Sequence, residues 1–138
     1  MTKCIRCQSS SPFRDIQRFA TACDQPATPE NYKMYLSLIN EEYNELLDAV
    51  LAEDKVEQLD ALVDILVVTM GAIRAAGWDG ESAWDEVMNT NFAKIDPKTG
   101  KVRKREDGKV LKPDGWKAPQ LSQFMNFADG EDTYDGPF

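Results

Sequence analysis

Helical periodicity is the feature that most constrains how this chain of 138 residues folds. In four successive segments the apolar residues recur three and four positions apart, so each segment presents one apolar face when it is coiled as an α-helix. No internal repeat is apparent. The pattern therefore predicts an all-α fold with a core of four helices, followed by an irregular, basic C-terminal arm.

Cap signals indicate where these helices begin and end. Ser11-Pro12 and Thr28-Pro29 each place an N-cap residue before a proline at the first helical position. Asp54 is expected to cap a third helix, in which Glu57 completes a capping-box-like pattern. Gly77 is typical of a helix C-cap. The helices are expected at about 12–20, 29–52, 56–76 and 80–91.

The chain is expected to divide into a flexible tail (1–10), a helical catalytic core (11–93), a basic substrate-closing arm (94–121) and a C-terminal tail (122–138). Turn signals occur in the arm at Asp96-Pro97-Lys98-Thr99-Gly100 and at Asp107-Gly108-Lys109. They suggest a short hairpin formed by Val102 and Val110.

Charge and composition exclude several classes of protein. The net charge of -8 argues against nucleic acid or an anionic membrane as the main partner. The longest apolar stretch is too short to span a bilayer, and no secretory signal is visible, so a cytoplasmic protein is expected. The chain has no histidine, which excludes histidine bases and ligands.

Three cysteines fit a reducing compartment. Cys4-x-x-Cys7 is either half of a zinc or redox site or, as we favour, part of a mobile tail.

Two acidic stripes are the main functional signal. At about 100° per residue, three glutamates of the second helix fall within an arc of about 100° beside its apolar face. Three acids of the third helix lie within about 60° of one another. Like charges at these spacings destabilise a helix. The members are Glu41, Glu42 and Glu45, and then Glu57, Asp60 and Asp64.

Asp64 is the most informative of these acids. From Leu62 onward its helix is apolar nearly all round, which predicts burial. A buried carboxylate needs a partner, and no basic residue lies within reach on the same helix. Mg²⁺ or Mn²⁺ satisfies such a cluster, because both prefer oxygen ligands. Acidic stripes are often simply solvated faces, and we assign Asp48, Glu53 and Asp54 to that class. Two facing stripes favour a metal site.

Four elements resemble the MazG-like, all-α nucleoside triphosphate pyrophosphohydrolase superfamily. Glu41-Glu42-Tyr43-Asn44-Glu45 is similar to its EExxE element, and Glu57-Gln58-Leu59-Asp60 to its ExxD element. Asn91-Phe92-Ala93-Lys94 resembles the Asn-x-x-Lys of a phosphoribosyl-ATP pyrophosphohydrolase-like branch. Gly108-Lys109-Val110-Leu111-Lys112-Pro113 resembles that branch's GKxxKP tail. The resemblance covers roughly residues 36–121.

The resemblance implies a metal-dependent enzyme that converts a (d)NTP and water to a (d)NMP and pyrophosphate. It also implies a homodimer or homotetramer, because members oligomerise so that helices of two subunits can line one site. The layout is similar to that of phage MazZ-like members, which favours purine deoxynucleotides such as dGTP and, for a phage protein, the cytoplasm of a bacterial host. Alternatives are dUTP or damaged dNTPs as substrates, or a non-catalytic nucleotide-binding helical module.

The site residues follow from the stripes together with the resemblance. Glu41 or Glu42 is expected to orient a water activated by metal for attack on the α-phosphorus, with two or three Mg²⁺ or Mn²⁺ ions per site. One register of the second motif uses Glu57 and Asp60, and the other uses Asp64, so all three are included. The expected metal ligands are Glu42, Glu45, Glu57, Asp60 and Asp64.

The arm carries the positive charge of the chain. Nine of its 16 Lys and Arg residues fall between Lys94 and Lys117, a segment able to close over phosphates or to remain a solvated loop. The resemblance favours Lys94, Lys109 and Lys112 as phosphate ligands, and Asn91 as an amide that contacts the base or the sugar. Trp116 is a candidate for stacking on the base, although aromatic packing is commoner.

Overall fold

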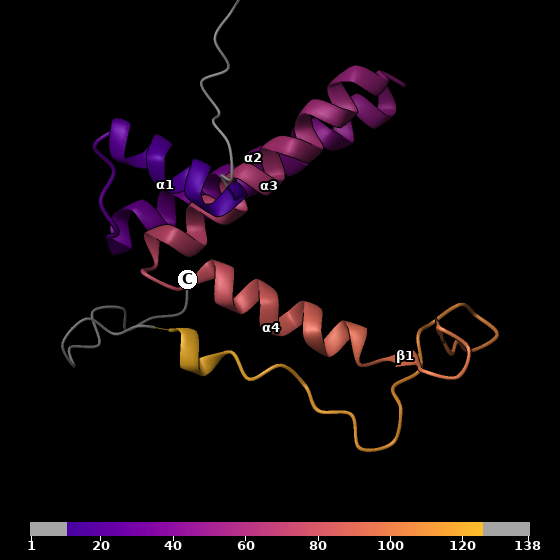
Figure 1. Cartoon of the computed structure of the whole chain (residues 1–138). Coiled ribbons are helices and arrows are strands. Elements are labelled where there is room, and N and C mark those ends of the chain that lie inside the picture. The colour runs from indigo at the N-terminus through magenta and orange to yellow at the C-terminus, as the bar shows by residue number, and fades with distance from the viewer. Residues whose placement is uncertain (1–10, 126–138) are drawn as a thin grey trace, which may run out of the picture. The chain divides into compact units, whose positions relative to one another are not determined.

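The computed structural model describes residues 11–125 and confirms the all-α fold with four helices. The predictions for the tail at 1–10, including Cys4 and Cys7, and for residues 126–138 lie outside the described residues. Figure 1 shows the elements in chain order. They are α1 (Pro12–Ala22), α2 (Pro29–Leu51), α3 (Lys55–Ala75), α4 (Gly80–Phe92), β1 (Ile95–Asp96), β2 (Lys101–Val102) and the 3-10 helix η1 (Ser122–Phe124).

The predicted caps are present at the starts of the first three helices. The Ser11 hydroxyl accepts the Arg14 N–H at 3.2 Å, and the Thr28 hydroxyl accepts the Asn31 N–H at 3.1 Å. The Asp54 carboxylate accepts two backbone N–H groups in the first turn of α3, each at 3.1 Å. Each bond satisfies a donor that has no partner within its helix. Local chemistry therefore fixes these helix starts.

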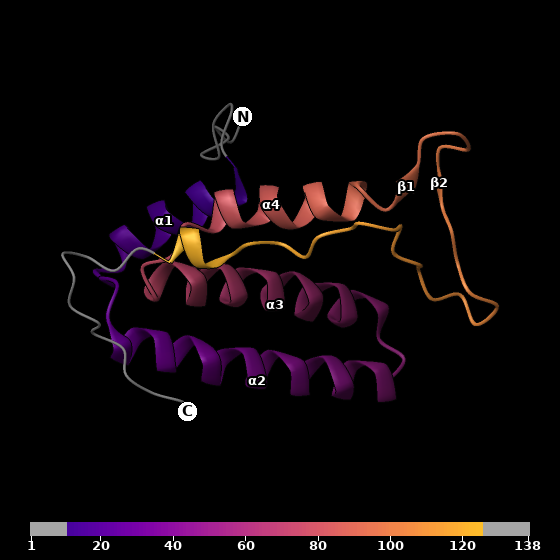
Figure 2. The same ribbon diagram turned by 90° about the horizontal axis from the view of Figure 1, so that it is seen from below.

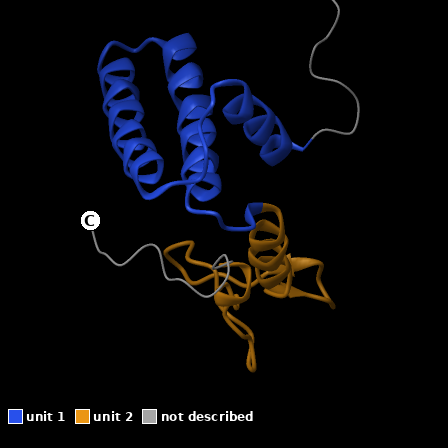
Figure 3. Ribbon diagram, turned by 90° about the vertical axis from the view of Figure 1, so that its left-hand side faces the viewer, with its two compact units in different colours: residues 1–80, 126–138 blue, residues 81–125 orange. Residues whose placement is uncertain are grey.

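The chain forms two compact units, drawn in separate colours in Figure 3. Unit 1 includes residues 11–80 with α1, α2 and α3, and unit 2 is residues 81–125 with α4 and the arm. The division into compact units falls after Gly80, and the arm packs on α4 within unit 2. The predicted functional division into a catalytic core (11–93) and a substrate-closing arm (94–121) stays a prediction.

Unit 1 is built on an antiparallel pair of helices, α2 and α3, joined by three residues and lying side by side along their length (Figure 2). Its buried cluster is Tyr35 of α2 against Val68, Ala72 and Ala75 of α3. The Tyr35 ring lies directly on Gly71, where no side chain intervenes. Small residues on α3 therefore let the two helices approach closely.

The first helix packs on α3 in the same unit. The guanidinium of Arg74 donates to the Gln17 side chain at 2.8 Å and to the Gln25 carbonyl at 2.6 Å. Gln25 also accepts the Tyr35 hydroxyl at 2.6 Å. Arg74 thus ties α1 and the loop after it to α3.

One prediction about α3 is wrong for the single chain. From Leu62 onward the helix was expected to be buried nearly all round, but four large apolar side chains there are exposed. Within residues 11–80, α2 and α1 pack on α3 and leave one apolar face uncovered. The exposed residues are Leu62, Val63, Leu66 and Val67. Among the helices of residues 11–125, none is long and apolar enough to cross a membrane.

Two turns of unit 2 form where turn signals were predicted, but the predicted pairing of Val102 with Val110 is wrong. Val102 pairs with Ile95 in the antiparallel β1–β2 ladder, and Val110 forms an isolated bridge with Lys104. The Asp96 carbonyl accepts the Gly100 N–H at 2.8 Å, and Gly100 has φ 69°, which glycine adopts at no steric cost. Each turn signal therefore closes its own short turn.

Candidate functional site

Glu42 lies at the centre of the acidic side chains of unit 1. It is half-buried, and its Oε2 atom is buried without a hydrogen-bond partner. Burial raises the pKa of this carboxyl above its ordinary value of 4.5, and the charges of Glu45, Asp64 and Asp60 raise it further. Glu45 is the neighbour that raises this pKa most.

The packing of α2 on α3 brings these acids together. Glu42 and Glu45 are three residues apart on α2, and Asp60 and Asp64 are four apart on α3, so each pair shares one side of its helix. All three neighbours act electrostatically on Glu42. We call these four residues the Glu42 cluster. Charges from both stripes therefore act on Glu42, and the predicted joint site stays a prediction.

The remaining predicted acids lie at the margin. Glu41 and Glu57 are exposed, and neither is among the acids that raise the pKa of Glu42. Glu57 lies in the first turn of α3, where its N–H donates to Asp54. Asp64 is half-buried rather than fully buried, because the face of α3 beside it is uncovered. Asp60 belongs to one register of the second motif and Asp64 to the other, and the charges of both raise the pKa of Glu42.

The donor set of the Glu42 cluster suits a divalent cation. Its oxygens are the ligand type that Mg²⁺ and Mn²⁺ prefer, and a buried oxygen without a donor gains most from a cation. Within residues 11–125, no three acidic or cysteine side chains already stand close enough together to hold one ion. The metal assignment stays a prediction.

Two lysines of unit 2 lie against the Trp116 ring. Its indole N–H donates to the Thr90 carbonyl at 2.7 Å, which fixes the ring to the last turns of α4. The ammonium nitrogens of Lys94 and Lys112 lie 4.9 Å and 4.7 Å from the ring centroid. The Lys94 ammonium also donates to the Asn91 side-chain oxygen at 3.0 Å. Four of the predicted substrate-binding residues therefore meet in one place.

Lys109 is placed differently from the other predicted lysines. It is exposed in a turn, where its backbone N–H donates to Asp107 at 3.1 Å. That turn is also held by the Arg105–Asp107 ion pair, which lowers the pKa of Asp107 through the hydrogen bond from Arg105. Lys109 is not one of the two lysines that lie over the Trp116 ring, so its role in phosphate binding stays a prediction.

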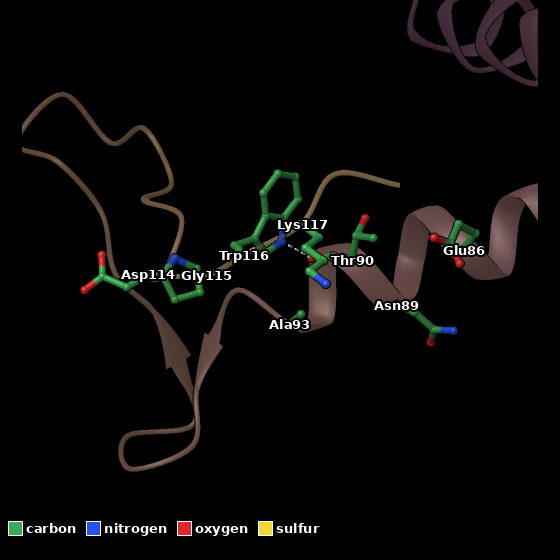
Figure 4. A pocket seen from close by; sticks show the side chains of 9 residues that line it. Glu86, Asn89, Thr90, Ala93, Asp114, Gly115, Trp116 and Lys117 are labelled. Atoms are coloured by element: carbon green, nitrogen blue, oxygen red, sulfur yellow. Dashed lines mark hydrogen bonds between the residues drawn. The ribbon is translucent and has the colours of Figure 1, made fainter. Parts of the chain in front are cut away.

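An open pocket of about 440 Å³ lies beside Trp116, between α4 and the returning arm (Figure 4). Glu86, one of its lining residues, accepts the backbone N–H of Gln120 at 3.1 Å and so holds the arm on α4. Sequence reasoning missed Glu86, because nothing in the order of residues shows which acid meets a backbone 34 positions away. The lining is Glu86, Asn89, Thr90, Ala93, Pro113, Asp114, Gly115, Trp116 and Lys117.

Comparison with known protein families gives a match over the helical part of the chain. Residues 16–91, more than half of the chain, match the family described as phosphoribosyl-ATP pyrophosphohydrolase. The matched range begins within α1, contains both acidic stripes and ends within α4. No curated protein matches the chain.

Proposed function

Because the chain belongs to the phosphoribosyl-ATP pyrophosphohydrolase family, whose members hydrolyse pyrophosphate bonds of nucleotides, we propose that it converts nucleoside triphosphates to monophosphates and pyrophosphate. Purine deoxynucleotides such as dGTP are the favoured substrates. This preference rests on the similarity of the layout to that of phage members, since the acids and lysines address only the phosphates and metal that all triphosphates share.

The observation that carries the proposal is the state of Glu42. A carboxyl with one buried, unpartnered oxygen and three acidic neighbours is costly to keep charged. Selection for stability alone would place an apolar residue or a basic partner there. Sites of chemistry are where such perturbed groups are concentrated.

The Glu42 cluster would hold Mg²⁺ or Mn²⁺, with Glu42, Glu45, Asp60 and Asp64 as the ligands. When bound, such ions neutralise phosphate charge and make hydroxide available near neutral pH. Glu57 and Glu41 lie on the same helices and are kept as candidates, Glu57 for metal and Glu41 for orienting water.

The chain's own groups supply the rest of the chemistry. A glutamate carboxylate can orient the attacking water and accept its proton as a general base. Glu41 and Glu42 of α2 are the candidates for this role. The ammonium groups of Lys94 and Lys112, and that of Lys109, are suited to bind phosphate oxygens as point charges.

Product analysis tests the proposal. Purified protein is incubated with each canonical dNTP and with Mg²⁺ or Mn²⁺, and monophosphate and pyrophosphate are quantified. Equal amounts of the two, greatest with dGTP, are expected. Release of inorganic phosphate instead would exclude attack at the α-phosphorus, and binding without turnover would favour the non-catalytic module. Faster hydrolysis of dUTP would overturn the purine preference.

Conservative variants test the site. Glu42→Gln and Asp60→Asn each remove one charge with little change in volume, and each should lower kcat by about a hundredfold or more if the carboxylate acts in the reaction. Asp48→Asn, an exposed acid of α2 outside the Glu42 cluster, is the matched control and should keep normal turnover. Near-normal rates in Glu42→Gln would show that the site is assigned wrongly.

The uncovered face of α3 supports self-association as part of the proposal. Exposed leucines and valines in a row on one helix are unusual for a monomer and typical of a subunit interface. A homodimer or homotetramer is proposed, with this face against a second copy of the chain.

A further inference from the structure

Trp116 makes three polar contacts, which packing of the ring alone does not require. The Thr90 carbonyl fixes its indole N–H, and two ammonium groups lie over the ring, one from the end of α4 and one from the arm. Lys94 and Lys112 are 18 positions apart along the chain. The indole is therefore the common support that brings them together.

Holding these two ammonium groups close together has an electrostatic cost. From their distances to the ring, the two nitrogens are less than about 10 Å apart, roughly one Debye length at 0.1 M salt, so their repulsion is not fully screened. Within the part of the chain that the structure describes, neither lysine forms an ion pair. The ring's negative face offsets part of the repulsion. An anion bridging the two lysines would offset the rest.

We propose that Trp116 is a positioning residue that holds Lys94 and Lys112 as a paired site for two adjacent phosphate groups, the diphosphate part of a nucleotide or free pyrophosphate. The identity of that ligand as substrate or product rests on the proposed function, whereas binding of the anion does not. Trp116 acts through the lysines and needs no contact with the base.

The geometry favours this role over base stacking. The indole N–H is committed to Thr90, and two ammonium groups already lie against the ring, so the contacts that Trp116 makes are with the lysines and α4. Asn91 adds to the same arrangement, since its side-chain oxygen accepts the Lys94 ammonium at 3.0 Å and restrains that side chain. Pre-placed donors bind an anion better than free lysines, because less side-chain freedom is lost on binding.

The test measures anion binding without turnover. Isothermal titration calorimetry with inorganic pyrophosphate and with tripolyphosphate is run on the full chain in EDTA. Trp116→Leu should weaken binding about tenfold, as loss of two cation–π contacts implies. Trp116→Phe keeps a ring but loses the N–H donor, so an intermediate loss is expected. The matched controls are Trp84→Leu, at an exposed tryptophan of α4, and Lys98→Gln, at an exposed lysine of the β1–β2 turn, and both should bind normally.

A double-mutant comparison separates positioning from direct contact. If Trp116 acts only through the lysines, adding Trp116→Leu to the Lys94→Gln/Lys112→Gln variant should cause no further loss of binding. An equal loss in both backgrounds, or unchanged binding in Trp116→Leu alone, would overturn the inference. Circular dichroism melting checks that each variant is folded. If Trp116→Leu is not, Trp116→Phe alone decides, in both lysine backgrounds.

The outcome is distinguishable from failure of the proposed function. Pyrophosphate bound in the expected pattern by a protein that hydrolyses no triphosphate would sustain the paired site and reject the enzyme. Hydrolysis with a normal KM in Trp116→Leu would sustain the enzyme and reject the paired site.

Discussion

At the residue scale, Glu42 couples the site to pH. In the folded, metal-free protein its pKa is raised, chiefly by burial and then by Glu45, Asp64 and Asp60, so the folded state binds this proton more tightly than the unfolded state. The stability that results is fully present below the ordinary pKa of 4.5 and is lost as pH rises through the folded value. Ionised Glu42 is therefore a destabilising group at neutral pH.

Glu42→Gln should accordingly be more stable than the native chain at pH 7 in EDTA, and the difference should shrink as pH falls toward 4.5. Urea denaturation across this range measures it. Asp48→Asn, which removes an exposed charge from the same helix, should not show this convergence. A Glu42→Gln variant that is less stable than the native chain at pH 7 would contradict the prediction.

Gly71 is the position where a single methyl group should do most harm. An added Cβ would lie 2.6 Å from Cδ1 of Tyr35, inside van der Waals contact, and the ring is buried. Gly71→Ala should therefore lower the free energy of unfolding by about 1–3 kcal/mol, as overpacking does. Combining it with Tyr35→Leu should cost less than the sum of the two single changes, measured by urea denaturation. Strict additivity would show that the two residues do not collide.

At the element scale, the helices were predictable and the arm was not. Thr28-Pro29 and Asp54 specify the starts of α2 and α3 through hydrogen bonds within three residues of the cap, so a local pattern contains all the information needed. The same holds for Gly77, whose positive φ of 78° ends α3.

The same distinction applies to the site. Helical spacing and a short connection predict that four acids share a region, namely Glu42, Glu45, Asp60 and Asp64. They do not predict which acid has the most shifted pKa, because the burial of each carboxyl depends on how α2 packs on α3. The pairings of Val102 and Val110 also failed, since two-residue strands carry no periodic signal. The contacts of Trp116 with Lys94 and Lys112 require the arm to fold back onto α4, which no local sequence pattern indicates.

Arg74 sets the position of one element on another. Its guanidinium bonds both Gln17 of α1 and the carbonyl of Gln25 in the loop that leads into α2. Arg74→Met keeps the apolar length and removes both bonds, so the free energy of unfolding should fall by about 1.5–3 kcal/mol, the worth of hydrogen bonds to a charged group. Lys33→Met, at an exposed lysine on α2, is the control and should change stability by less. Equal losses in both variants, measured in urea, would show that Arg74 does not hold α1.

At the scale of the whole molecule, the uncovered face of α3 is the proposed subunit interface. Leu62 is 49% exposed and Leu66 56% exposed, although both lie in the most apolar helix of the chain. Burying such a side chain stabilises an interface by about 1.5–3 kcal/mol, and a charge placed there would have to be buried unpaired. Leu62→Glu and Leu66→Glu should therefore each convert a native oligomer to monomer, as sedimentation velocity at micromolar concentration can measure.

The same experiment links assembly to the Glu42 cluster. Val67 is exposed on α3 and lies three residues after Asp64, on the same side of the helix, so a second copy that covers Val67 would exclude water beside Asp64. Removing water strengthens the electrostatic coupling between the acids, so assembly should raise the pKa of Glu42 beyond the rise seen in the single chain, and the monomeric variants should lose turnover. Leu121→Glu, on an exposed apolar residue of unit 2, should leave both the assembly and the turnover unchanged. A native chain that sediments as a monomer, or a monomeric Leu66→Glu variant with full activity, would show that the apolar face and the chemistry are independent.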